Sequence, residues 1–351
     1  DEVAVPANPF AEHLEAALAD ATERRPDLVV ALAALTPVLT DGATDAAQRF
    51  QQTSGMVMAK GVEDCAFFRW PRLSMLTEVG GEPSIFALSP ELVYGGLAQR
   101  QALWPRTMTT RTTHDTKRGE DVRARVAVLS EVPELWATAV RRLQELAPMP
   151  DGSFANLVWQ AAVGAWPISA ERLHAFAEKA MREAGVHTTW TNVDESYESA
   201  VHGAIDAMYA DERVRSVLLE VVSVVVDAGW SNALSATAIS LTMPGVPDVY
   251  QGSELWQLCL TDPDNRRPID FAARERALAE LPAEPDWGEL GTRFADGHVK
   301  FALTRQLLAV RGDRPELFAN GIYEPIEVEG PHARHVLAFA RTLRRHAVIV
   351  V

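Results

Sequence analysis

The chain of 351 residues has little cysteine, a deficit of positive charge and no long uninterrupted apolar stretch. Its two cysteines, Cys65 and Cys259, are too few for a disulfide framework, which indicates a reducing compartment. Lysine and arginine number 33 against 48 aspartates and glutamates, giving a net charge of −15. Because binding to phosphates needs a concentrated basic surface, nucleic acid is not expected as a partner.

The apolar stretches are short as well. The longest aliphatic run, residues 214–226, is interrupted by Glu220 and Ser223, so we expect no membrane span. No apolar segment follows a basic start at the amino terminus, so we expect no signal peptide. Hydrophobic residues make up 47% and charged residues 23% of the chain, which is typical of a globular protein. These features predict a soluble, cytoplasmic protein.

Helical periodicity is the strongest local pattern in the sequence. Residues 10–39 predict two helices separated by Pro26, and a long helical block is expected over residues 120–228. Within that block, Ser169 is expected to cap a helix that stops at Gly185. A further helix is expected over residues 299–310.

Strand-like segments are few and short. Residues 55–61 predict a buried strand that ends at a glycine turn and presents Lys60, Glu63 and Asp64 at its carboxyl end. Two more strands are expected at residues 107–113 and 246–250, and several short strands within residues 322–351.

The segment Arg111–Arg118 is the most informative one. Its strand-forming start delivers adjacent His114 and Asp115 into a polar, cationic turn. A carboxylate at such a position can stabilise positive charge or bind a sugar hydroxyl, and the imidazole can make a second hydrogen bond. The alternative is a loop salt bridge among Asp115, Lys117 and Arg118.

Four collinear segments together resemble the maltooligosyltrehalose synthases, isomerases of the α-amylase-type glycoside hydrolase clan. They are RFQQT with VMAKGVED at residues 49–64, THDTKR with EDVRAR at 113–125, VHT through Trp190 at 186–190, and PGVPDVYQG with DPDNRRP at 244–268. Two residues depart from the family's usual pattern: Cys65 replaces a common Thr and Phe68 a common Tyr.

The resemblance implies the second half of a (β/α)8 TIM barrel, an α/β fold, with a helical insertion and the start of a carboxyl-terminal β-domain. The implied parts are residues 1–119 (barrel, near its sixth and seventh strands), 120–230 (insertion), 231–320 (barrel, eighth strand and following helix) and 321–351 (incomplete β-domain). The strands at residues 56–60, 107–113 and 246–250 would be the sixth, seventh and eighth.

The implied reaction moves the reducing-end glucose of a maltooligosaccharide from an α-1,4 to an α-1,1 linkage. Retaining glucosyl transfer needs two carboxylates about 5–5.5 Å apart, a nucleophilic Asp and an acid/base Glu. The sequence contains neither matching segment, so the resemblance predicts a complementary amino-terminal half as partner. Asp115 resembles the third carboxylate, which stabilises the transition state, and His114 would support the same sugar ring.

The remaining candidates would close the site around one glucose and exclude water. These substrate-binding candidates are Lys60, Glu63, Asp64, Lys117, Arg118 and Tyr250. The alternative for each is an ion pair or hydrogen bond that only stabilises a loop. Trp70, Trp104 and Trp256 are candidates for stacking on sugar, whereas the tryptophans of the insertion are expected in the core. The loop at residues 262–268 is expected to be stabilised by its own Arg–carboxylate contacts, with Arg266 and Arg267 at the rim of the site.

No cofactor is expected, and the histidine spacing predicts no metal site. Two alternatives stay open for the function. The chain could belong to another α-glucanotransferase or an α-amylase-like hydrolase of the same clan. Without a partner half, it would be an inactive glucan-binding fragment.

Overall fold

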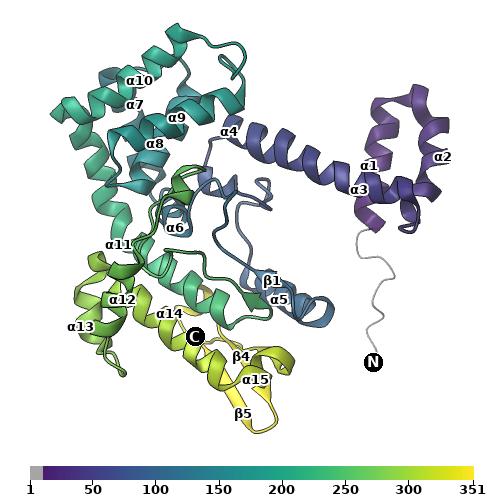
Figure 1. Ribbon diagram of the computed structural model, residues 1–351, viewed down its shortest axis with the longest axis vertical. Helices are drawn as coiled ribbons and strands as arrows, with labels where there is room; N and C mark the ends of the chain where they lie inside the picture. The colour runs from purple at the N-terminus through teal and green to yellow at the C-terminus, as the bar shows by residue number, and fades with distance from the viewer. Residues whose placement is uncertain (1–10) are drawn as a thin grey trace. The chain divides into compact units, whose positions relative to one another are not determined.

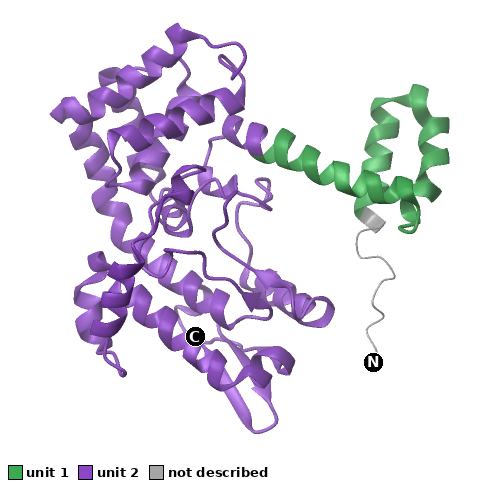
Figure 2. Cartoon of the chain, viewed as in Figure 1, with its two compact units in different colours: residues 1–63 green, residues 64–351 purple. Residues whose placement is uncertain are grey.

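Helices dominate the described part of the chain, residues 11–351, in this computed structural model (Figure 1). Residues 1–63 and residues 64–351 form separate compact units (Figure 2). The first unit holds α1 (Ala11–Arg24), α2 (Val29–Thr40) and α3 (Asp45–Val57), so the two helices predicted before residue 40 are confirmed. The Thr44 hydroxyl caps α3 by accepting a hydrogen bond from the Ala47 amide at 3.1 Å.

The strand predicted at residues 55–61 is wrong, because this segment is helical. The end of α3 is followed by a π-helical turn, η2 (Met58–Ala66), and by α4 (Phe67–Arg69). Periodicity cannot separate a short apolar strand from a helix, and Met, Ala and Lys favour the helix. The side chains of Met56 and Val57 are more than half exposed, so the expected burial is absent too.

The second unit is built around a helical core. Ser169 caps α9 by accepting from the Arg172 amide, and Gly185 ends it with a φ of 59°, so both predicted boundaries are confirmed. Trp159 is completely buried, and Trp136 and Trp166 pack against the same core, as predicted. The helices of this part are α5 (Pro90–Leu103), α6 (Glu120–Val128), α7 (Pro133–Leu146), α8 (Gly152–Ala165), α9 (Ala170–Ala184), α10 (Glu195–Ala210) and α11 (Glu212–Thr242).

Helix α11 is longer and more apolar than the aliphatic run at residues 214–226 indicated. By length and composition alone it is long and apolar enough to cross a membrane, and a pair of helices bent by 97°, residues 26–40 and 45–69, would pass the same test as one span. However, α11 packs against α6, α7, α8, α10 and α14, and Val217, Leu218 and Val225 on it are completely buried. A central helix of a protein core has these same properties, so α11 is weak evidence for a membrane span.

Two small sheets contribute the strands. β1 (Met108–Thr109) pairs in parallel with β2 (Val246–Pro247), which places the two predicted strands side by side, although each is shorter than expected. The predicted terminal strands are confirmed as an antiparallel sheet of β3 (Ile322–Pro325), β4 (Phe339–Leu343) and β5 (His346–Val350). The helices between the sheets are α12 (Phe271–Glu280), α13 (Trp287–Thr292), α14 (His298–Asp313), which confirms the helix predicted at 299–310, and α15 (Pro315–Asn320).

A buried ionic cluster joins α6 to α14 beneath the loop that follows β1. The Lys300 ammonium is completely buried and lies 2.8 Å from carboxylate oxygens of both Glu120 and Asp121. Burial raises the pKa of Asp121, whereas the charges of Lys300 and Arg111 outweigh burial and lower the pKa of Glu120. The base of the loop is therefore fixed to two helices by charge as well as by apolar packing.

Candidate functional site: the His114–Asp115 loop

The parallel strand pair positions the loop that carries His114 and Asp115. The Val246 amide donates to the Thr107 carbonyl at 2.8 Å, and the Asp248 amide to the Thr109 carbonyl at 2.7 Å. The chain then leaves β1 and reaches α6 through residues 110–119. The loop thus begins at the carboxyl end of a parallel strand, where α/β folds display functional side chains.

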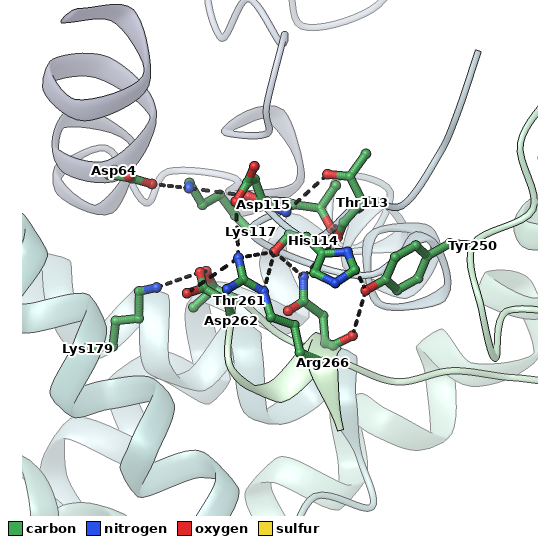
Figure 3. Close-up of polar contacts among 12 residues, drawn as sticks. Asp64, Thr113, His114, Asp115, Lys117, Lys179, Tyr250, Thr261, Asp262 and Arg266 are labelled. Atoms are coloured by element: carbon green, nitrogen blue, oxygen red, sulfur yellow. Dashed lines mark hydrogen bonds and ion pairs between the residues drawn. The ribbon is translucent and has the colours of Figure 1, made fainter. Parts of the chain in front are cut away.

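Asn265 and Arg266 hold the backbone of this loop, and the contacts of Arg266 can be followed in Figure 3. The buried Asn265 amide donates to the carbonyl oxygens of Thr113 and His114, both at 2.9 Å. The Arg266 guanidinium donates to the His114 carbonyl at 3.0 Å and to the Asp115 carboxylate at 3.1 Å. Asp115 is nevertheless 78% exposed, so its carboxylate remains open to a ligand.

Tyr250 fixes the imidazole of His114. The two rings meet edge to face with centroids 5.5 Å apart, and the Tyr250 hydroxyl lies 3.3 Å from Nδ1 of His114. The same hydroxyl donates to the Asn265 carbonyl at 3.0 Å. Burial raises the pKa of Tyr250, which keeps the phenol protonated and able to donate. The structure thus brings three predicted site residues together: His114, Asp115 and Tyr250.

Lys117 points back under the loop. Its ammonium pairs with the Asp64 carboxylate, contacts the Asp115 carbonyl at 3.4 Å and lies 5.9 Å from the centroid of the Phe68 ring. Only 3% of the Lys117 side chain is exposed, against 19% for Asp64. The pair therefore orders the backbone of Asp115 here, and direct contact of either residue with a sugar stays a prediction.

Arg118 is completely buried beneath the loop. Its guanidinium donates to the Thr77 carbonyl at 3.1 Å, and its backbone amide donates to the Glu78 carboxylate at 3.0 Å. Burial lowers the pKa of Arg118 to about 10, so the side chain still carries its charge at neutral pH. In this structure Arg118 stabilises the loop from below, and its role in substrate binding stays a prediction.

Lys60 and Glu63 both lie in η2, in the first unit, and each makes at least one polar interaction. Their predicted role in closing the site stays a prediction. Among the aromatic candidates, Trp70 and Trp104 are 37% and 55% exposed. Trp256 instead stacks on Trp230 at a centroid distance of 5.8 Å and packs in the core, so it does not offer a free face as expected.

The loop at residues 261–268 is the second wall of the site. Arg172 of α9 binds Asp264 with two hydrogen bonds of 2.7 and 2.8 Å, and Arg267 pairs with the same carboxylate at 3.0 Å. Burial acts to raise the pKa of Asp264, but these arginines and the Leu260 amide outweigh it and lower the pKa. The predicted Arg–carboxylate contacts are confirmed, with α9 supplying one arginine that the sequence did not indicate.

The sequence did not indicate two supporting residues, Asn265 and Glu78. Asn265 stands in the DPDNRRP segment, so that segment was a signal that could have identified it. Nothing in the sequence near Glu78 marks it, although its carboxylate accepts hydrogen bonds from the amides of Lys117 and Arg118. Among residues 11–351, no three His, Cys, Asp or Glu side chains are grouped closely enough to hold a metal ion. The site presents to a ligand an exposed carboxylate, Asp115, and an oriented imidazole, His114. Such groups bind and polarise hydroxyls.

Replacing Asn265 by alanine tests how much the loop depends on this one amide. The substitution removes both hydrogen bonds to the loop carbonyls and leaves these acceptors poorly solvated. We therefore expect the free energy of unfolding to fall by about 1–3 kcal/mol. Urea denaturation measures this change. Asn320→Ala is the matched control, since Asn320 is exposed and bonds only within its own helix turn and to Arg106. Equal effects of the two substitutions would show that Asn265 does not hold the loop.

Known proteins with the same arrangement cover nearly the whole chain. A Mycobacterium tuberculosis protein that carries the name maltooligosyl trehalose synthase is 44% identical over 335 residues, 93% of this chain. The solved maltooligosyltrehalose synthase of Arthrobacter ramosus is 44% identical and superposes on 94% of the chain with a TM-score of 0.83. The chain is a homologue of the maltooligosyltrehalose synthases. A further solved maltooligosyl trehalose synthase, 28% identical, covers 92% of the chain with a TM-score of 0.77.

The chain matches less than half of the length of each of these relatives. The chain spans 42% of the M. tuberculosis protein and 43% of the A. ramosus chain, and the matched part is their carboxyl-terminal half. No family model matches the sequence.

Proposed function

We propose that this chain supplies the transition-state carboxylate of a (1→4)-α-D-glucan 1-α-D-glucosylmutase, an enzyme of trehalose biosynthesis. The reaction would convert the reducing-end α-1,4 bond of a maltooligosaccharide to α-1,1 by intramolecular glucosyl transfer. The observation that carries the proposal is the exposed Asp115 carboxylate, held beside His114 at the end of a parallel strand in a homologue of maltooligosyltrehalose synthases. No cofactor is needed for this chemistry.

Asp115 would bind hydroxyls of the distorted sugar ring. As positive charge develops at the anomeric carbon, a fixed carboxylate binds the ring more tightly and lowers the barrier. His114, oriented by Tyr250, would form a hydrogen bond with the same ring. Lys60, Glu63, Asp64, Lys117 and Arg118 would act by closing or ordering the site so that the released glucose, and not water, attacks the intermediate.

The nucleophile and the acid/base would come from a complementary amino-terminal half. Met108 and Val246, the first paired residues of β1 and β2, are 75% and 47% exposed, and within residues 11–351 each strand has only the other as neighbour. Exposed apolar strands with open edges favour pairing with further strands. Such strands would complete a (β/α)8 barrel in which residues 1–119 and 231–320 belong to the barrel, 120–230 form an insertion and 321–351 begin a β-domain.

The reaction product tests the proposal. When this chain is combined with the missing half, maltopentaose should yield mainly a non-reducing product that ends in trehalose, measured by loss of reducing ends and by chromatography. The chain alone should show no turnover, because two of the three catalytic carboxylates would be absent. Glucose and maltose as main products would favour the α-amylase-like hydrolase instead, and turnover by the chain alone would contradict the assignment of the missing carboxylates. We expect the assembled enzyme to be soluble and cytoplasmic.

A further inference from the structure

A small pocket lies beside α4, within the second unit. It has a volume of about 190 Å³, and its walls come from α4, α8, α9, α10 and the segment after α9. Phe68 lines the pocket, and its ring also receives the Lys117 ammonium at 5.9 Å. The pocket is therefore a neighbour of the His114–Asp115 loop, yet it contains none of that loop's residues. Its polar wall consists of Arg69, Asp151, Ser153, His187 and Tyr197.

One wall of the pocket carries an oriented imidazole. Nε2 of His187 lies 3.3 Å from Oδ2 of Asp151, while Oδ1 of Asp151 caps α8 by accepting from the amides of Ser153 and Phe154. The His187 ring packs on the Tyr197 ring with centroids 4.6 Å apart. Because Asp151 is fixed by its helix, the imidazole is held in one orientation, and 44% of its side chain is exposed.

The Tyr197 hydroxyl is an unused polar group of this pocket. Tyr197 is only 7% exposed, and within residues 11–351 its hydroxyl has no hydrogen-bond partner. Burial and the nearby charge of Asp151 raise the pKa of Tyr197, so the phenol stays protonated and keeps its donor. The hydroxyl oxygen is not sealed from solvent, so it is available to donate a hydrogen bond to a molecule bound in the pocket.

The composition of the walls defines the ligand. Phe68, Phe154 and Tyr197 supply flat apolar faces, and hydroxyl, imidazole and carboxylate groups supply a few directed hydrogen bonds. The volume lies below the ~300 Å³ at which pockets for drug-sized ligands begin, so one ring of a ligand fits. A ring with apolar faces and hydroxyls at its rim matches this combination.

The geometry points to a second carbohydrate site, in which one glucose ring of a glucan lies between Phe68, Phe154 and Tyr197 and bonds to Tyr197, His187 and Asp151. This site would hold a glucan by a ring other than the one that reacts beside Asp115. The choice of glucose as the sugar rests on the proposed function, whereas the presence of a site for a neutral hydroxylated ring rests on the pocket alone.

Maltose binding to the full chain tests the inference. Calorimetry should show saturable binding that Tyr197→Phe weakens about tenfold, since the substitution removes one buried hydrogen bond and keeps the ring. Tyr209→Phe is the matched control, because the Tyr209 hydroxyl donates to the Ile168 carbonyl outside the pocket and its removal should leave the affinity unchanged. Equal affinities of the Tyr197→Phe and wild-type chains would overturn the inference.

A second measurement uses the wild-type chain, so it does not depend on whether a variant folds. Diethyl pyrocarbonate modifies exposed imidazoles, and maltose should slow its reaction at His187 at least fivefold while the rate at the exposed His332 stays constant, as read by peptide mass spectrometry. Undiminished reaction at His187 under saturating maltose would overturn the inference. If the completed enzyme hydrolyses maltopentaose but His187 is still protected, the proposed function fails and the pocket assignment holds.

Discussion

Asp115→Asn should abolish glucosyl transfer in the completed enzyme while leaving the fold intact. The amide keeps the size of the side chain but loses the negative charge that would stabilise the transition state, so we expect kcat to fall about a thousandfold or more. The Asp115 side chain is 78% exposed and has one ion pair, with Arg266, so the melting temperature should change little. The measurement is the rate of loss of reducing ends from maltopentaose.

The control for this prediction is Asp227→Asn. Asp227 is an exposed aspartate on α11, so its replacement makes the same chemical change at a distant surface position. It should retain wild-type activity. A loss of less than tenfold in Asp115→Asn would reduce Asp115 to a structural residue of the loop, paired with Arg266 and not with Lys117 or Arg118 as the alternative interpretation expected.

Lys300→Met should have the largest effect on stability. The substitution leaves Glu120 and Asp121 buried without their shared cation, and an uncompensated buried charge typically costs about 3–5 kcal/mol. Urea denaturation at pH 7 measures the loss. Arg142→Met removes an exposed pair with Glu220 and should cost less than about 1 kcal/mol. Asp121→Asn added to Lys300→Met should restore part of the stability, because it removes one of the two buried charges.

The pH dependence of the Lys300→Met chain follows from the same cluster. Burial already raises the pKa of Asp121, and loss of Lys300 removes the main charge that opposes this increase. A carboxyl whose folded pKa is raised stabilises the fold below its unfolded pKa, and this contribution is lost as the pH rises through the folded pKa. The deficit relative to wild type should therefore shrink as the pH falls from 7 towards 4.5. A deficit that is constant over this range would show that the two carboxylates do not titrate in the folded variant.

The sequence predicted those elements whose signal is local. Ser169 and Gly185 bound α9 as expected because a hydroxyl cap and a left-handed glycine act within one helical turn. Residues 107–113 and 246–250 contain strands because branched residues favour extended backbone. The segment at 55–61 was predicted wrongly because its apolar run fits both periods, and the Thr44 cap that starts the helix lies eleven residues earlier.

Site residues could be predicted from the sequence only where the type of side chain and its position after a strand indicated a function. His114, Asp115 and Tyr250 were identified as polar groups beside strand ends, and the structure brings them together. The burial of a side chain depends on residues far away in the sequence. For this reason Arg118 was expected to contact the substrate, although it is completely buried and contacts Thr77. Asn265 was missed for the related reason that its two acceptors are more than 150 residues away along the chain.

The parallel pairing of β1 with β2 also has a kinetic consequence. The Thr110 hydroxyl and the Asp248 carboxylate, beside the two strand ends, are 138 residues apart in sequence, and the helices α6 to α11 lie between them. Closing so long a segment of chain costs entropy before any strand contact is gained, whereas helices gain their contacts locally. The helices between the strands therefore should form first and shorten the effective loop. The His114–Asp115 loop should then be one of the last parts of the molecule to acquire its shape, both during synthesis and after every unfolding event.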